Sequence, residues 1–214
     1  MVATLLASVT LAVWEDIQGD DRRTLGFVVA GLVGLWVGFV GAPVVAARLK
    51  GSGSVVADFG LRVRPLDIPL GLVVGVASQL VLVRLLYLPF KWLAPGFYER
   101  VGEETDEVLD VTAAGGRVLL VVLLVLAVPV VEELFFRGLV QGALLKRLGR
   151  PAPAVAIGAV VFGVTHYQPV ALLGLVAFGV VLGVLVVRAG RLGPALVAHA
   201  AFNAAAVADY FLRT

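Results

Sequence analysis

Long apolar runs constrain this chain more than any other feature. They occupy approximately residues 24–47, 68–90, 117–145, 152–167, 169–187 and 193–212. A helix that crosses a membrane needs about 20 mostly apolar residues, because the hydrocarbon core is about 30 Å thick. Mean hydropathy is +1.02, and only 15% of the residues are charged, against about a quarter in soluble domains. The sequence therefore predicts an all-α fold, a polytopic transmembrane helical bundle of about six to seven spans.

The predicted number of spans is six or seven because residues 1–14 form a shorter apolar run. No basic residue precedes the run, and Glu15 and Asp16 follow it. A secretory signal peptide normally begins with a basic segment. We interpret this segment as a short first helix or an interfacial segment and not as a cleaved signal peptide.

The linkers between the runs alternate in charge. Basic linkers carry Arg48, Lys50, Arg62 and Arg64, then Lys146, Arg147 and Arg150, then Arg188 and Arg191. The linker at about residues 91–117 is instead rich in acids. By the positive-inside rule, the basic linkers are expected in the cytoplasm and the C-terminus outside.

Composition also excludes several functions. The formal net charge is only +2, so a nucleic-acid partner is not expected, whereas the lipid bilayer is. The sequence contains 0 cysteines, which removes disulfides, thiol catalysis and thiolate metal sites.

A few charged and polar residues lie inside the apolar runs. They are Arg84, Glu132, Glu133, Arg137, His166, His199, Asn203 and Asp209. An ionisable group at membrane depth costs several kcal/mol, so each one is a hypothesis for a functional site. The alternative is a structural polar network that holds the bundle together. Arg84 is expected to extend toward the membrane surface, with a role as counter-ion to Glu132 as the alternative, and Asp209 is expected at the interface.

The segment "PVVEELFFRG", residues 129–138, carries three of these charges. Glu133 and Arg137 are four residues apart on a helix, so they share a face and can form an ion pair. Glu132 is rotated by about 100° from Glu133 and lacks that cation. A carboxylate left without a cation is suited to act as a general base. Pro129 is expected to kink the helix and free a backbone carbonyl, which favours a buried polar cavity.

The chain has 2 histidines, and each one has a neighbour on its helix face. Phe162 precedes His166 by four residues, and Asn203 follows His199 by four. Counted from the basic ends of their helices, Glu132, His166, His199 and Asn203 lie at depths of about 20, 23, 9 and 15 Å. All four depths fall within the hydrocarbon core, so these side chains are expected to converge on one buried cavity.

Three motifs appear in order: "EELFFRG" fits EExxxR, "FGVTH" fits FxxxH and "HAAFN" fits HxxxN. In this order they resemble the CPBP family of intramembrane proteases, which includes the CAAX endopeptidases. The resemblance implies a catalytic helical bundle over 116–214, with membrane helices and linkers over 1–115. It also implies an endopeptidase that cleaves membrane-embedded or lipid-anchored peptides.

The resemblance also implies roles for individual residues. Glu132 would activate water with help from His166. His199 and Asn203 would stabilise the oxyanion, and Glu133 and Arg137 would support the site.

Several alternatives stay open. Two histidines and a carboxylate can bind zinc, although no HExxH motif is present and no cofactor is favoured. A catalytically silent scaffold or a bacteriocin-immunity protein would keep the same helices. A transporter would also bury charges, but no internal repeat is visible. A serine protease of the rhomboid kind is disfavoured, because no GxSx-type motif lies in an apolar run.

Overall fold

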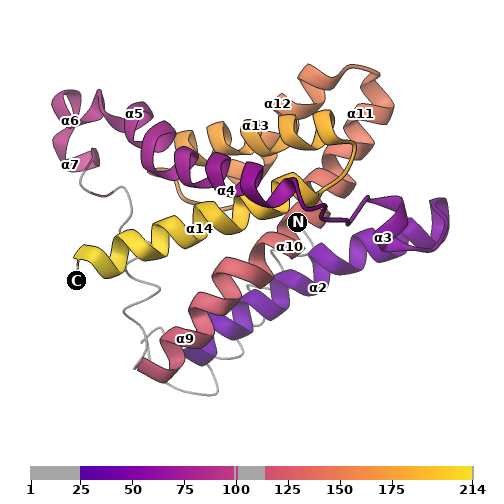
Figure 1. The fold of residues 1–214 in the computed structure, drawn as a ribbon, viewed down its shortest axis with the longest axis horizontal. Coiled ribbons are helices and arrows are strands. Elements are labelled where there is room, and N and C mark those ends of the chain that lie inside the picture. Colours follow the sequence, from indigo (N-terminus) through magenta and orange to yellow (C-terminus); the bar gives the residue numbers. More distant parts are fainter. Residues whose placement is uncertain (1–24, 99, 101–113, 214) are drawn as a thin grey trace.

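The structure is a computed structural model, and it describes residues 25–98, 100 and 114–213. Within these ranges the secondary structure is helical and contains no strand, which confirms the all-α prediction. The α-helices (Figure 1) are α2 (Leu25–Lys50), α3 (Val55–Asp58), α4 (Asp67–Ala77), α5 (Arg84–Tyr87), α6 (Phe90–Leu93), α7 (Pro95–Tyr98), α9 (Ala114–Val122), α10 (Val128–Glu132), α11 (Gly142–Leu148), α12 (Pro151–Val164), α13 (Leu172–Ala189) and α14 (Gly193–Arg213). The apolar run at residues 1–14 lies outside the described ranges.

Five helices of the described part are long and apolar enough to cross a membrane. They cover Val29–Lys50, Asp67–Leu93, Gly116–Leu148, Leu172–Ala189 and Gly193–Arg213. The run expected at 152–167 forms the shorter helix α12, whose 14 residues span only about 21 Å. The polytopic bundle is therefore confirmed, and α12 differs from the other five because it is too short to cross the hydrocarbon core alone.

Two of the long helices contain π-helical turns. These turns are Ser78–Val83 in the helix that begins at α4, and Leu123–Ala127 and Glu133–Gln141 in the helix that runs from α9 to α11. The last two lie on either side of α10, which contains the buried Pro129. A π-helical turn inserts an extra residue into a helix and is frequent at functional sites. The irregularity expected from Pro129 thus takes the form of π-helical turns on both sides of it.

Helix α14 packs closely against α4, and small residues make this packing possible. A Cβ atom added at Gly75 would lie 2.1 Å from the carbonyl oxygen of Ala198 and 2.7 Å from the Cβ of Ala201. At Gly71, an added Cβ would lie 2.5 Å from the Cβ of Val197. The missing side chains let the two backbones approach, as small residues do in membrane helices. This contact fixes the part of α14 that carries His199.

Helix α2 runs beside the helix that carries the EExxxR motif (Figure 1). Phe39 of α2 stacks on Phe135, with ring centroids 4.3 Å apart. It also meets Phe136 edge to face at 5.2 Å. These aromatic contacts bury the apolar side of the motif helix, so its polar side chains face the interior of the bundle.

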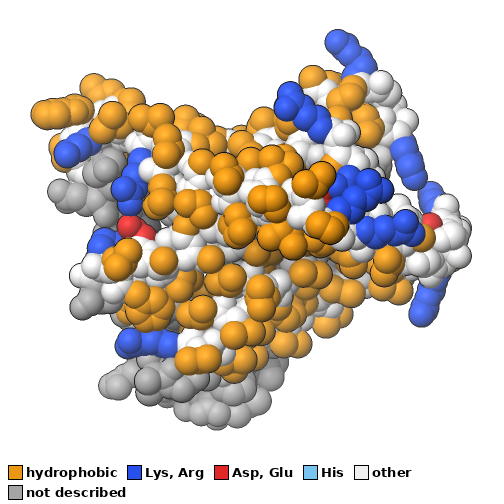
Figure 2. All heavy atoms as spheres, in the orientation of Figure 1, with side chains coloured by type: hydrophobic (Ala, Val, Ile, Leu, Met, Phe, Trp, Pro, Cys, Tyr) orange, Lys and Arg blue, Asp and Glu red, His pale blue; other side chains and the backbone are white. Residues whose placement is uncertain are grey.

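The face of the molecule shown in Figure 2 is largely apolar, and many of the Lys and Arg side chains on it gather at one end. At this end the buried carboxylate of Asp67 pairs with the Arg191 guanidinium, and the Arg64 backbone N–H donates to Asp67 Oδ2 at 2.8 Å. Nearby, the Ser52 backbone N–H donates to the exposed carboxylate of Asp58 at 2.9 Å, which lowers the pKa of Asp58 below its usual value. The ion pair ties the start of α4 to the turn before α14.

Candidate functional site

Glu132 lies between the two histidines of the chain. Its Oε2 atom is 3.9 Å from the Nε2 of His166 and 3.8 Å from the Nε2 of His199. Only 8% of Glu132 is exposed, and Oε2 has no hydrogen-bond partner in the described part of the protein. Separations near 4 Å are too long for direct hydrogen bonds. The carboxylate and the two imidazoles therefore lie close together but do not form hydrogen bonds with one another through these atoms.

His166 lies in the turn after α12 and not within the helix, which ends at Val164. Its Nδ1 atom is 2.7 Å from the carbonyl oxygen of Phe162, and the Thr165 hydroxyl donates to the same oxygen at 2.9 Å. A carbonyl oxygen can only accept, so Nδ1 donates this hydrogen bond and Nε2 is the nitrogen that faces Glu132. The following residue, Tyr167, has φ of 56°, a left-handed conformation that side chains with a Cβ rarely adopt. The short helix thus places His166 at a sharp reversal of the chain.

His199 is held by Glu133. Its Nδ1 atom is 2.9 Å from Glu133 Oε1, and only 4% of the histidine is exposed. Because an ionised carboxylate can only accept, Nδ1 donates to Glu133 and Nε2 is the nitrogen that faces Glu132, as in His166. The rings of Phe162 and Phe178 lie nearly perpendicular to the imidazole, with centroids at 5.9 and 5.6 Å. The orientation of His199 is therefore set on several sides.

The expected Glu133–Arg137 ion pair is present, with Nη1 3.2 Å from Oε1. Its angle is not that of a hydrogen bond, because Nη1 has no hydrogen-bond partner in the described region. The guanidinium lies 4.2 Å from the ring centroid of Phe162, within the range of a cation–π contact. Its Nη2 donates to the carbonyl of Gly179 at 3.4 Å. Glu133 thus faces two partners, Arg137 and His199, whereas the sequence suggested only the arginine.

Asn203 makes a contact that the sequence did not suggest. Its Nδ2 donates to the carbonyl oxygen of Leu124 at 2.8 Å. Leu124 lies in the π-helical turn Leu123–Ala127. One of the two amide hydrogens of Asn203 is therefore engaged with the backbone of the motif helix.

Arg84 pairs with Asp209 and not with Glu132. Its Nη2 lies 3.0 Å from Asp209 Oδ1, and the two side chains are 61% and 35% exposed. The alternative of a counter-ion for Glu132 is therefore wrong. Arg84 and Asp209 instead join the second apolar helix to the C-terminal part of α14 at the protein surface.

Sequence reasoning missed two buried polar residues near the site. Gln141 donates from Nε2 to the Gly183 carbonyl at 3.1 Å. Its position four residues after Arg137 was the available signal. The Tyr87 hydroxyl donates to the Val170 carbonyl at 2.7 Å and accepts from the Gly174 N–H at 3.0 Å. Tyr87 thereby fixes the chain that follows His166, a long-range contact without a local sequence signal.

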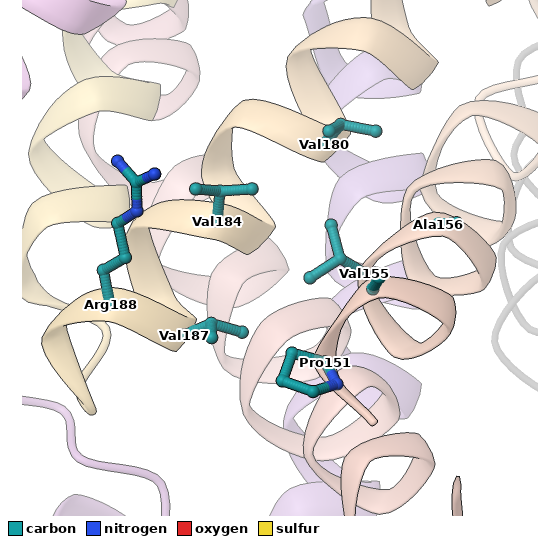
Figure 3. Close-up of a pocket in the computed structure, with 8 residues that line it drawn as sticks. Pro151, Val155, Ala156, Val180, Val184, Val187 and Arg188 are labelled. Carbon is teal, nitrogen blue, oxygen red and sulfur yellow. The ribbon is translucent and has the colours of Figure 1, made fainter. Parts of the chain in front are cut away.

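Two hollows lie away from Glu132. One, of about 400 Å³, opens at the basic end, and Arg137, Gln141 and Lys146 are among its lining residues. The other, of about 360 Å³, is a groove between α12 and α13 with valine walls and Arg188 at one end (Figure 3). The groove shares no lining residue with the three groups around Glu132.

The zinc alternative depends on the spacing of the groups around Glu132. In the described ranges, no group of three or more His, Cys, Asp or Glu side chains has the arrangement of a metal site. Two ligands of a tetrahedral zinc ion lie about 3.3 Å apart, given Zn–N and Zn–O distances of about 2.0–2.1 Å. The Glu132–histidine separations of 3.9 and 3.8 Å are wider. The spacing of Glu132 Oε2 from the two imidazoles is therefore wider in this structure than that of the ligands of a tetrahedral zinc ion.

These features define a class of protein, namely a polytopic helical membrane protein with a carboxylate–histidine cluster buried among its helices. Residues 114–205 match the family model described as type II CAAX prenyl endopeptidase Rce1-like, so this segment of the chain is similar to that family. The matched segment contains all six candidate site residues. No curated protein and no solved structure matches the chain.

Proposed function

We propose that this protein is an intramembrane endopeptidase that hydrolyses peptide bonds of membrane-embedded or lipid-anchored substrates. The observation that carries the proposal is the position of Glu132 Oε2, buried and within 4 Å of both histidine Nε2 atoms. The family match supports the same class of reaction.

In the proposed reaction Glu132 acts as the general base. A water molecule held between Glu132 and His166 loses a proton to the carboxylate as its oxygen attacks the carbonyl carbon of the substrate. The resulting tetrahedral intermediate collapses when the C–N bond breaks and the leaving nitrogen receives the proton from Glu132. Such proton transfer contributes about 100- to 10,000-fold to a rate. His166, whose side chain is 22% exposed, assists on the more accessible side of the cluster.

His199 and Asn203 are proposed to stabilise the oxyanion of that intermediate. Because Nδ1 of His199 faces Glu133, its Nε2 can donate only when the ring carries both protons. The Glu133 carboxylate offsets the charge of this form, and Arg137 in turn balances Glu133. The amide of Asn203 has a second hydrogen besides the one bonded to Leu124. Each of the six candidate residues thus has a role.

We propose that the protein's own side chains activate the water, without a metal ion. The wide Glu132–histidine separations support this choice. The alternative, a zinc-dependent protease, predicts stoichiometric zinc in the purified protein.

The surface of the protein and the charges of its linkers support a location and an orientation in the membrane. The largely apolar face in Figure 2 and the five long apolar helices of the described part support a location of the helices in a lipid bilayer. We propose that the basic linkers face the cytoplasm, that the C-terminus lies outside, and that residues 116–214 form the catalytic bundle on which the helices of 1–115 pack. The family name indicates CAAX prenyl peptides, and we propose membrane-anchored peptides as the substrate class of this chain.

The test is cleavage of a panel of membrane-anchored peptides by purified protein in liposomes, with products identified by mass spectrometry. Glu132→Ala and His166→Ala should each lower the rate by at least about 100-fold. If both variants cleave as fast as the wild type, the catalytic assignment is wrong. If the folded wild type cleaves no peptide of the panel, the result favours a catalytically silent scaffold or immunity protein.

A further inference from the structure

The carbonyl of Leu124 lacks the helical donor that its position calls for. In the turn Leu123–Ala127, the Val128 N–H donates to the Leu123 carbonyl, five residues earlier. The same register would pair the Leu124 carbonyl with the N–H of residue 129. That residue is Pro129, which has no N–H. The π-helical register thus leaves this carbonyl, in the interior of the motif helix, without its backbone donor.

Asn203 supplies the missing hydrogen bond from another helix. Its Nδ2 lies 2.8 Å from the Leu124 oxygen. Asn203 follows His199 by four residues on α14, so both side chains lie on the face toward the motif helix. His199 contacts that helix at Glu133, at 2.9 Å. Helix α14 therefore has two polar attachments to the motif helix, on either side of Glu132 along the chain.

We propose that Asn203 is a positioning residue, whose amide replaces the hydrogen bond that Pro129 cannot give and thereby fixes α14 against the turn preceding Glu132. This attachment fixes the rotation and height of α14 and, with them, the approach of His199 Nε2 to Glu132. The effect on rate rests on the proposed function, whereas the effect on stability does not. The role is separate from oxyanion stabilisation, because it uses the other amide hydrogen.

A double-mutant cycle tests the proposal, because Pro129→Ala restores a backbone N–H five residues after Leu124. The four proteins are wild type, Asn203→Ala, Pro129→Ala and the double variant. Thermal unfolding in detergent measures how much the Asn203–Leu124 hydrogen bond contributes to stability, independently of activity. The kcat and KM for a cleaved peptide measure its effect on the site.

In the wild-type background, Asn203→Ala is expected to lower Tm by about 2–6 °C and kcat by about tenfold with little change in KM. In the Pro129→Ala background the loss of Tm should be at most half as large. The loss of kcat should be smaller but should not disappear, because a backbone N–H at residue 129 cannot replace the second amide hydrogen of Asn203 at the oxyanion. Rescue by a distant backbone N–H is not expected of a residue that serves only the oxyanion.

Equal losses of Tm in both backgrounds would overturn the proposal, whatever the activity. If Asn203→Ala lowers Tm less in the Pro129→Ala background, but the folded protein cleaves no peptide, the positioning role of Asn203 is supported and only the proposed function is contradicted. Asn203→Leu is a second variant that avoids any change at Pro129. It keeps about the size of the side chain but has no group that can donate a hydrogen bond, so wild-type Tm and kcat for this variant would overturn the proposal.

Discussion

The imidazole of His199 and the carboxylate of Glu133 share a hydrogen bond of 2.9 Å between Nδ1 and Oε1. Glu133 thus does more than balance Arg137, since it determines which nitrogen of His199 faces Glu132. The two adjacent glutamates of the EExxxR motif therefore have different environments. Glu133 Oε1 lies 3.2 Å from Arg137 Nη1 and 2.9 Å from His199 Nδ1, whereas Glu132 Oε2 lies 3.9 and 3.8 Å from the two histidine Nε2 atoms. The Oε2 atom of each glutamate has no hydrogen-bond partner in the described structure.

Glu133→Gln should lower kcat by roughly 100-fold, because the amide removes the charge opposite His199 and Arg137 and allows the other imidazole tautomer. Steady-state cleavage of a membrane-anchored peptide measures the effect. Asp209→Asn is the matched control, because it makes the same chemical change on α14 at a surface position that faces Arg84. Its kcat should stay within about twofold of wild type. Equal activity of both variants and the wild type would remove Glu133 from the mechanism.

Gly75→Ala should destabilise the fold by about 1–3 kcal/mol, because its Cβ would lie 2.1 Å from the carbonyl of Ala198 and overpack the α4–α14 contact. Thermal unfolding in detergent measures this loss, and kcat should fall with it because Ala198 precedes His199. Gly41→Ala in helix α2 is the matched control. An added Cβ there meets nothing within 4 Å, so helix propensity should stabilise the protein by up to about 1 kcal/mol. Equal stability of the two variants would contradict the close packing.

Arg84→Ala should leave kcat unchanged and cost less than about 1 kcal/mol of stability, because the pair with Asp209 is exposed and such pairs contribute little. The measurement is again peptide cleavage, together with thermal unfolding. A loss of kcat above tenfold at unchanged stability would restore Arg84 as a partner of the site.

Metal removal should leave activity intact. Purified protein, dialysed against a strong chelator and analysed for zinc by mass spectrometry, is expected to cleave at the rate of untreated protein. If activity disappears with the zinc and returns when zinc is added back, the metal-free mechanism is wrong.

Much of the fold and the main polar residues could be predicted because their signals are local. Apolar runs define membrane helices, since the bilayer admits few other structures. The Glu133–Arg137 pair follows from the spacing of neighbouring turns. The charges inside the runs drew attention to Glu132, His166 and His199, because burying them is costly.

What could not be predicted depends on contacts between distant segments. The hydrogen bonds from His199 to Glu133 and from Asn203 to Leu124 require the register of α14 against the motif helix, which no local pattern encodes. The π-helical turns cannot be read from residue spacing either. Helix α12 ends at Val164, before its apolar run does, because the side chains of Thr165 and His166 bond to the carbonyl of Phe162.

The most direct test of the central claim is the single-turnover rate of Glu132→Gln on a membrane-anchored peptide, compared with wild type in the same liposomes. The substitution keeps the size of the side chain but replaces the carboxylate with a neutral amide, which cannot act as a general base. We expect a rate at least about 1,000-fold lower, with unchanged peptide binding and unchanged Tm, because a general base contributes up to about 10,000-fold. A rate within tenfold of wild type would contradict the assignment of Glu132 as the residue that activates water.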